Sequence, residues 1–441
     1  MKPQPSHKIL IGIISASFLL SLCYSFLYKI EPVVDARSYD QIAVNLLAGQ
    51  GFKEDSTLSY EFDPSIIRAG PLYEFFLAGV YGTFGYHFEV VWILQALLHA
   101  ATAFIIFLTA RILFPERGDA IGLVAAALIG FHPDLIEISA MLMTETLYLF
   151  LVTLTVFLFF KVYQKPSSLR LALLLGASTG LSLLIRPPVL LFVPVFLCLF
   201  GIRKEYKGAA AFLLTLVLFL SPWVMRNYVV YKQFIPTTLI GEYNVWVGNT
   251  LVSDGGQLSM GDNPATAYLE TNGVFGFKEK AGVEFRSFVR LHPMQFIELS
   301  AVRTIRYMSL IRPMGFWFYE SGLPQLTFIA LSGLSIMILF VTGAAGLWRV
   351  FQQKKEWRYY VAALALAAPL PLIFTVVQSR YRFQVYPLLA LFGAYFLVEL
   401  YKRSPGAFKT GCLTLALFLV VTAIDAAAFW PVVVERLGKF F

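Results

Sequence analysis

Long apolar runs alternate along the chain with short clusters of polar and charged residues. A helix needs about 20 apolar residues to cross a membrane, and most of these runs approach or exceed that length. Eleven runs are predicted to be transmembrane helices: 9–28, 88–113, 119–137, 141–163, 169–187, 188–203, 208–227, 323–350, 358–378, 383–402 and 408–430. Another apolar stretch, 71–85, is too short to cross and is expected to lie in the interface or re-enter. The pattern predicts an all-α polytopic membrane protein.

The apolar runs divide the chain into five parts. These are a signal-anchor helix at 1–28, a first outer loop with amphipathic helices at 29–87, transmembrane helices 2–7 at 88–227, a larger outer loop at 228–322, and transmembrane helices 8–11 at 323–441. The first run follows Lys2 and Lys8, as the apolar core of a cleaved signal peptide would. It is longer than such a core, and no small-x-small site closes it. We therefore interpret it as an uncleaved anchor.

The composition narrows the class of protein further. Of the 441 residues, 58% are hydrophobic and 14% are charged, whereas about 25% are charged in a typical soluble domain. These values exclude disorder and an ordinary cytosolic enzyme. The formal net charge is +8, and about half of the 35 Lys and Arg residues lie in short loops that are cytoplasmic if the N-terminus is inside. The charge therefore orients the spans, places both long loops outside and gives no indication of a nucleic-acid partner.

The first outer loop contains a candidate catalytic acid. One stripe of an amphipathic helix is formed by the apolar positions Tyr39, Ile42, Ala43, Leu46 and Leu47. Ser38 and Gln41 have the spacing of a capping box, so the helix is expected to begin at Ser38. Asp35 then has no capping role and lies at the membrane boundary. There its carboxylate is placed to accept a proton from a substrate hydroxyl.

Arginines gather at the outer ends of the predicted spans, where the positive-inside rule predicts few of them. They are Arg186, Arg226, Arg380 and Arg382. Each one singly is explained as well by a snorkelling side chain or a structural ion pair. As a set they favour a site for a phosphorylated lipid, because guanidinium groups bind phosphate oxygens in a bidentate manner.

Other patterns carry less information. The segment 241–249 is rich in aromatic and amide side chains, and we predict a strand and hairpin there, with a turn that stacks on sugar rings as the alternative. The chain has no Walker loop, HExxH, CxxC or GxSxG motif. Its five histidines are too few for a metal site built from histidine.

With these residues in place, the chain resembles the GT-C superfamily of integral-membrane glycosyltransferases. The resemblance is to the protein O-mannosyltransferase and aminoarabinose transferase group, which is glycosyltransferase family 39-like. The motifs that carry it are Asp35–Asp40 with Gly49–Phe52, Arg68–Tyr73, Thr144-Glu145, Arg186-Pro187, Pro222–Tyr228, and Arg380-Tyr381-Arg382 followed by Pro387. Their order, spacing and common sidedness make the resemblance specific, although each motif alone is only moderately so.

The resemblance implies a GT-C fold and an inverting glycosyltransferase. Such an enzyme moves a sugar from a polyprenyl-phosphate-linked donor to an acceptor hydroxyl or phosphate at the outer face of a bacterial or archaeal plasma membrane. Asp35 would be the catalytic base, and the four arginines would bind the donor phosphate. Substrate contacts are expected from Arg37, Tyr39, Asp40, Arg68, Tyr73, Glu145, Asn227 and Tyr381. The expected partners are the donor lipid, a glycan, lipid or protein acceptor, and membrane lipids.

One departure from the family pattern bears on a metal. Many relatives have Asp-Glu in the first loop, whereas Ala36 follows Asp35 here, which puts metal dependence in doubt. A divalent cation stays a candidate cofactor, with Asp40 or Glu145 as substitute ligands. Only residues 431–441 follow the last predicted span, too few for the C-terminal domain of several relatives.

Two other functions remain as alternatives. The first is a lipid or glycolipid transporter or flippase, which would show internal repeats and ionisable groups near the bilayer midplane. We find no repeat, and the charges gather at one face. The second is a polymerase or ligase for lipid-linked glycans, which composition does not exclude.

Overall fold

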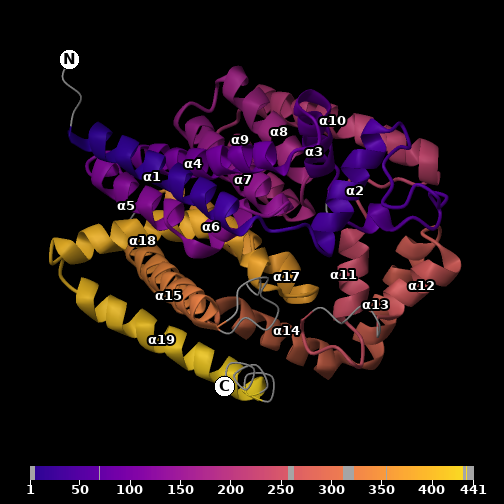
Figure 1. Ribbon diagram of the computed structural model, residues 1–441. Helices are drawn as coiled ribbons and strands as arrows, with labels where there is room; N and C mark the ends of the chain where they lie inside the picture. Colours follow the sequence, from indigo (N-terminus) through magenta and orange to yellow (C-terminus); the bar gives the residue numbers. More distant parts are fainter. Residues whose placement is uncertain are drawn as a thin grey trace.

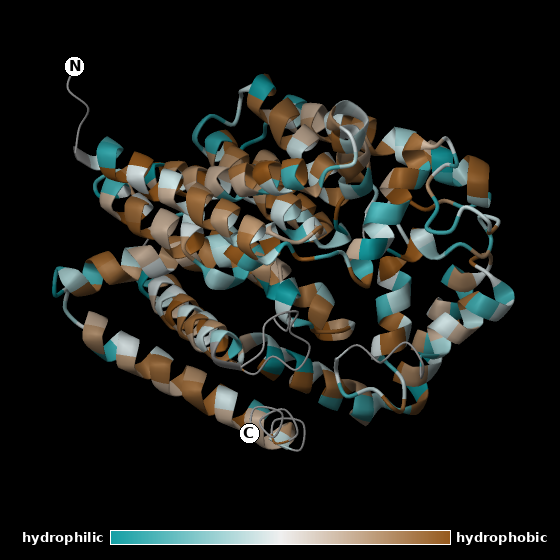
Figure 2. Cartoon of the chain, viewed as in Figure 1, coloured by the Kyte–Doolittle hydropathy of each residue, from teal (hydrophilic) through white to brown (hydrophobic). Residues whose placement is uncertain are grey.

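The computed structural model describes residues 5–68, 70–256, 263–310, 322–353, 355–430 and 434. Long helices run roughly parallel in a bundle. The shorter helices of the two long loops that are predicted to lie outside (29–87 and 228–322, called the outer loops below) gather at one end of it (Figure 1). Apolar residues cover most of the long helices, whereas hydrophilic residues concentrate in the turns and at that end (Figure 2). The prediction of an all-α polytopic membrane protein is confirmed.

In the described part of the chain, eight helical segments are long and apolar enough to span a membrane. They are α1 (Pro5–Tyr28), α4 (Phe88–Leu113), α7 (Thr144–Gln164), α10 (Tyr206–Tyr231), α15 (Gly322–Gln352), α16 with α17 (Trp357–Ala367 and Leu370–Phe374), η4 with α18 (Ser379–Val385 and Tyr386–Tyr401), and α19 (Ala407–Ala428). Each coincides with one of the eleven predicted runs.

The other three predicted runs are helical but irregular. Helices α5 (Gly118–Gly130) and α6 (Pro133–Ser139) form an apolar pair bent by 57°, the geometry of a broken span or of a re-entrant loop. Helix α8 (Leu169–Leu183) is a shorter apolar helix, and the following run divides into η2 (Pro187–Phe192) and α9 (Val193–Ile202). Proline explains these breaks, because it lacks the N–H that continues a helix and disfavours helical geometry in the preceding residue.

The first outer loop forms α2 (Asp35–Leu47), η1 (Pro64–Ile67) and α3 (Leu72–Phe84). The predicted helix start at Ser38 is wrong, because α2 begins at Asp35 and Ser38 makes no capping bond. Instead, Ser38 Oγ donates to Glu54 Oε1 at 2.7 Å. Asp35 lies in the first turn, where the partial positive charge of a helix N-terminus favours a carboxylate.

The described part of the second outer loop contains α11 (Ile240–Gly248), α12 (Pro264–Asn272), α13 (Phe277–Leu291) and α14 (Pro293–Met308). The predicted strand and hairpin at 241–249 is wrong, because this segment is α11. Its buried residues Tyr243, Trp246 and Val247 have helical spacing and pack in a core with Phe277. This core is separate from the main core between the spans.

Candidate active site

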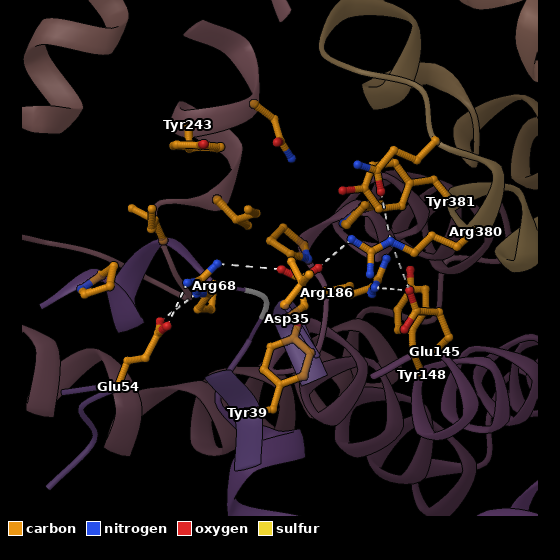
Figure 3. Close-up of a pocket in the computed structure, with 18 of the residues that line it drawn as sticks. Asp35, Tyr39, Glu54, Arg68, Glu145, Tyr148, Arg186, Tyr243, Arg380 and Tyr381 are labelled. Atoms are coloured by element: carbon orange, nitrogen blue, oxygen red, sulfur yellow. Dashed lines mark hydrogen bonds and ion pairs between the residues drawn. The ribbon is translucent and has the colours of Figure 1, made fainter. Parts of the chain in front are cut away.

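A cavity of about 670 Å³ lies where the first outer loop, the start of α7, the segment after α8, helices α11 and α12, and residues 372–384 meet. Charged side chains from several of these segments converge on Asp35 (Figure 3). The cavity is also lined by apolar side chains, including Leu58, Phe62, Leu149 and Phe383. This combination suits a ligand with a charged head and a hydrocarbon part.

Asp35 is at the centre of the charged cluster. Its Oδ2 accepts a hydrogen bond from Arg380 Nη2 at 2.6 Å, and its Oδ1 lies 3.6 Å from Arg68 Nη1. Burial alone would raise the pKa of Asp35, but the positive charges of Arg380 and Arg68 outweigh burial and hold this pKa below its usual range. The carboxylate is therefore ionised at neutral pH, as a proton acceptor must be.

The residue before Asp35 has an unusual backbone conformation. Val34 has a φ of 50° and a ψ of −116°. A β-branched residue rarely adopts a positive φ, because its side chain collides with the backbone. Strain of this kind persists only where surrounding contacts over-determine it. The ion pairs of Asp35 supply such contacts, so the bend at Val34 and the position of the carboxylate support each other.

Arg68 is held by a second carboxylate, which the sequence did not single out. Its Nε and Nη2 donate to Glu54 Oε2 and Oε1 at 2.8 Å and 2.9 Å, a bidentate arrangement. Arg68 and Glu54 are both largely buried and both line the cavity. Burial tends to lower the pKa of Arg68, but Glu54 and Asp35 raise it above its usual value. Glu54 thus fixes the guanidinium beside Asp35.

Glu145 joins the other two arginines of the cavity. Its Oε1 accepts from Arg186 Nη2 at 2.6 Å and lies 3.6 Å from Arg380 Nε. Thr144 Oγ1 accepts from Arg186 Nε and Nη2 at 3.0 Å and 2.8 Å. Arg186 has the extended backbone that a following proline imposes, which directs the chain away from α8. The Nε of Arg380 also donates to Gln378 Oε1, at 2.9 Å.

The cavity cluster is therefore balanced in charge. Three guanidinium groups, of Arg68, Arg186 and Arg380, face three carboxylates, of Asp35, Glu54 and Glu145. Balance is needed, because a buried unpaired charge costs several kcal/mol. Every one of these groups is at a cavity wall, so an anionic ligand can compete with the carboxylates for the guanidinium donors.

Comparison with known proteins bears on the fold. Residues 68–225 match the family model described as dolichyl-phosphate-mannose-protein mannosyltransferase. No curated protein matches the chain. Among solved structures, the oligosaccharyltransferase of Archaeoglobus fulgidus, in complex with Zn and sulfate, aligns with a TM-score of 0.54 at 14% identity, covering 94% of this chain and 52% of that one.

Two further structures agree with this match. Archaeal oligosaccharyltransferase AglB from A. fulgidus, in complex with an inhibitory peptide and a dolichol-phosphate, has a TM-score of 0.54 at 13% identity over 95% of this chain and 56% of that one. ArnT from Cupriavidus metallidurans, bound to undecaprenyl phosphate, has a TM-score of 0.53 at 11% identity, and the alignment covers 97% of this chain and 71% of that one. The chain has the GT-C fold. The resemblance to the GT-C superfamily is thus confirmed. The chain spans about half the length of the A. fulgidus proteins.

Seven predicted site residues line the cavity. They are Asp35, Tyr39, Arg68, Glu145, Arg186, Arg380 and Tyr381. Tyr381 lies under both Arg186 and Arg380, with each guanidinium carbon 5.5 Å from its ring centre. The structure therefore brings together residues that are up to 346 positions apart in the sequence.

Arg226 and Asn227 lie elsewhere in the GT-C fold. The guanidinium of Arg226 is enclosed by the rings of Phe52, Tyr60, Trp223 and Tyr231, at 4.9 to 5.7 Å from their centres. Asn227 Nδ2 donates to two backbone carbonyls, of Ile235 and Thr237. Neither residue lines the cavity. This corrects the grouping of Arg226 with Arg186 and Arg380, because an outer helix end alone does not specify the direction of a side chain.

Arg382 also departs from the predicted grouping. It is two residues beyond Arg380 in η4, and a two-residue step in a 3-10 helix rotates the side chain by about 240°, onto another face. Its Nη1 accordingly donates to the Ser309 carbonyl at 2.5 Å, away from the cavity lining.

The remaining three predicted substrate residues do not line the cavity either. Arg37 is exposed. Asp40 accepts from the hydroxyls of Tyr81 and Tyr86, both at 2.7 Å. Tyr73 donates its hydroxyl to Gln95 Oε1 at 2.8 Å. The hydrogen bonds of Asp40 and Tyr73 stabilise the packing of α2, α3 and α4.

The cavity residues do not fit a divalent cation. Within the described ranges, no three His, Cys, Asp or Glu side chains gather in a way that could hold one. The proposed substitute ligands are engaged: Glu145 pairs with two arginines, and Asp40 accepts from two tyrosines outside the cavity lining.

Several residues that line the cavity were not predicted from the sequence to be site residues. Besides Glu54, they include Tyr148 and Gln378, whereas Tyr243 and Asn244 belong to the segment 241–249, for which contact with sugar rings was the alternative prediction. Tyr148 is one turn after Glu145 on α7, so helical spacing from a predicted residue could have identified it. The others depend on how distant segments pack, which no local pattern encodes.

Proposed function

We propose that the protein is an inverting glycosyltransferase that moves a sugar from a polyprenyl-phosphate-linked donor to an acceptor hydroxyl or phosphate. The observation that carries this proposal is the position of Asp35, an ionised carboxylate on a cavity wall beside Arg68 and Arg380. The fold supports it, because similar structures hold dolichol-phosphate and undecaprenyl phosphate.

The chemistry follows from charge placement. The acceptor oxygen attacks the anomeric carbon of the donor sugar, and Asp35 takes the proton when the acceptor is a hydroxyl. The bond between the anomeric carbon and the phosphate oxygen breaks, and its electron pair leaves with the phosphate. Arg186 and Arg380 neutralise the charge that develops there. Attack opposite the leaving phosphate inverts the configuration of the sugar.

Arg380 couples donor binding to activation of the base. Its guanidinium contacts Asp35 at 2.6 Å and Glu145 at 3.6 Å, so a bound phosphate competes with both carboxylates for it. When Arg380 turns to the phosphate, Asp35 loses the partner that most lowers its pKa. Asp35 then becomes a stronger base at the moment the donor is in place.

The proposed location of the site is the outer face of a bacterial or archaeal plasma membrane. The cavity is built largely from the segments 29–87 and 228–322, which the distribution of Lys and Arg predicts to be outside. Polyprenyl phosphates place their charged head at such a surface, next to Arg186 and Arg380. A transporter is a weaker proposal, because these charges surround one cavity at a single end of the bundle.

The test is transfer by the purified protein in lipid nanodiscs. Radiolabelled undecaprenyl-phosphate sugars are supplied singly, with a bacterial envelope extract as acceptor, and products are identified by mass spectrometry. Asp35→Asn should abolish transfer at unchanged thermal stability and lipid binding. Asp55→Asn is the matched control, because Asp55 is an exposed acid of the same loop outside the cavity lining. Full activity of Asp35→Asn would refute the role of Asp35, and the absence of transfer from every donor would refute the function.

A further inference from the structure

Arg303, on α14, is a buried cation that the proposed chemistry does not use. Its side chain is 0% exposed. No carboxylate of the described residues forms an ion pair with it, and burial lowers its pKa to about 10, so it remains charged at neutral pH. A guanidinium is not buried without partners. Its Nη1 and Nη2 groups donate to two helix ends.

The first of these ends is that of α11. Arg303 Nη2 donates to the Gly248 carbonyl, and Nη1 donates to Asn249 Oδ1 at 3.2 Å. The second end is that of α17, where Nη1 also donates to the Ile373 carbonyl at 3.3 Å. The last carbonyls of a helix have no intrahelical partner and carry partial negative charge, so one cation satisfies both ends.

The two helix ends also contact each other directly. Asn249 Nδ2 donates to the Phe374 carbonyl at 3.0 Å. A Cβ added to Gly248 would overlap the Thr375 carbonyl, so only glycine permits this approach of the two backbones. We call these contacts of Arg303, Gly248 and Asn249 with residues 373–375 the α11–α17 joint.

The joint connects two walls of the cavity. Helix α11 contributes Ile240, Tyr243 and Asn244 to the lining, whereas the chain after α17 contributes Gln378 and Arg380. Tyr243 is fixed in turn, because its hydroxyl accepts from Asn263 Nδ2 at 2.6 Å and lies 3.1 Å from Thr266 Oγ1. The joint therefore links the wall that carries Tyr243 to the chain that leads to Arg380, so a change in the joint is expected to alter the cavity width between them.

The α11 wall faces Asp35 from the side opposite the phosphate site. In Figure 3, Tyr243 and Arg68 lie on one side of Asp35, and Arg186 and Glu145 lie on the other. Inversion requires the acceptor to approach from the side away from the leaving phosphate. If the phosphate binds Arg186 and Arg380, the acceptor enters along Tyr243 and Asn244.

We infer that the α11 wall is the acceptor subsite and that Arg303 is its positioning residue, acting through the α11–α17 joint. The assignment of the acceptor rests on the proposed function, whereas the mechanical role of Arg303 does not. The acceptor chemistry is that of a neutral hydroxyl-bearing group, because this wall offers a phenol ring and an amide to it.

The mechanical part is tested by distance measurements between spin labels. Labels are placed at Gly241→Cys on α11 and Leu370→Cys on α17, both exposed, after Cys23, Cys198 and Cys412 are replaced by Ser. Arg303→Met and Gly248→Ala should each broaden the distance distribution, and Arg303→Lys should broaden it less. The matched control is Arg306→Met, which removes another buried arginine of α14 whose ion-pair partners are Asp254 and Asp425. Unchanged distributions, or equal broadening in the control, would overturn the role of Arg303.

The acceptor part is tested kinetically with the same variants. Undecaprenyl-phosphate mannose is the donor, or whichever undecaprenyl-phosphate sugar the wild type uses, and the envelope extract is the acceptor. Arg303→Met should raise the half-saturating extract concentration about tenfold and change the donor KM less than twofold. Arg306→Met should change neither value, although it lowers the melting temperature. A donor KM that rises as much as the extract value would contradict the subsite. If the wild type transfers nothing, the proposed function and the subsite fail together, while the distance measurement still decides the joint.

Discussion

Replacing Arg380 by Gln would separate the two roles that we assign to this side chain, which are to bind the donor phosphate and to lower the pKa of Asp35. The change removes a charge 2.6 Å from Asp35 and 3.6 Å from Glu145, and it leaves an amide that can still donate a hydrogen bond. Loss of one preorganised charged donor at a developing anion costs ~10²–10³-fold in kcat, or about 2.7–4 kcal/mol. We expect a loss of this size, together with weaker binding of undecaprenyl phosphate.

The pH dependence gives the sharper measurement. Asp35 acts as its carboxylate, so the rate falls as the pH drops through the pKa of Asp35. Arg380 lowers that pKa, and its removal leaves burial, which raises it, opposed by Arg68 and more distant charges. The acid limb of the profile of kcat/KM should therefore move to higher pH in Arg380→Gln.

The assay is kcat/KM from pH 4 to 9 in nanodiscs, with melting temperatures at each pH. Arg380→Lys keeps the charge and loses the guanidinium fork, so its acid limb should move less. Arg286→Gln removes an exposed arginine of α13 and serves as the control for charge alone. An acid limb that stays in place in Arg380→Gln, at reduced activity, would refute the coupling between Arg380 and Asp35.

Three further predictions follow from single side chains. Glu145→Gln should leave Arg186 and Arg380 without their shared carboxylate, which costs about 3–5 kcal/mol of stability, and undecaprenyl phosphate should then raise the melting temperature more than in the wild type. Glu74 of α3 is fully buried, and burial raises its pKa from 4.5 to about 8. The folded state then holds a proton that the unfolded state loses, so the free energy of unfolding should fall by up to about 4–5 kcal/mol as pH rises through that interval, and Glu74→Gln should flatten this dependence in denaturation curves. Val34→Gly should relieve the strain of a positive φ and change the melting temperature little or raise it, while kcat falls because Asp35 is held less firmly.

The arrangement of helices was accessible from the sequence because a membrane imposes one dominant rule. Backbone groups in lipid must be paired within a helix, so apolar runs such as 88–113 have little alternative. Where that rule does not act, local signals were overridden. Helix α2 begins at Asp35, which forms ion pairs, and not at the capping box of Ser38. The aromatic pattern at 241–249 is the buried face of α11.

The candidate site was predictable in its residue types and only partly in its membership. Asp35, Arg186 and Arg380 are charged residues at helix ends. They stand out in the sequence because charged groups are costly, and therefore rare, at membrane depth. Whether such a side chain points toward a common cavity depends on its position around the helix axis. Arg380 and Arg382 show this, because they are two residues apart and have separate environments.

The pairing of each cavity arginine with a particular carboxylate was the least predictable feature, and it bears directly on the proposed reaction. Without ligand, each cavity arginine needs a carboxylate, because an isolated buried guanidinium is costly. The phosphate carries about one negative charge in the donor and about two after the sugar has left. Guanidinium groups that turn from Asp35 and Glu145 toward the phosphate oxygens gain electrostatic stabilisation. This stabilisation is larger once the second negative charge develops than it is in the bound donor. Binding that strengthens toward the transition state accelerates a reaction, so under the proposed function the exchange of partners at Arg380 and Arg186 would itself be a source of rate.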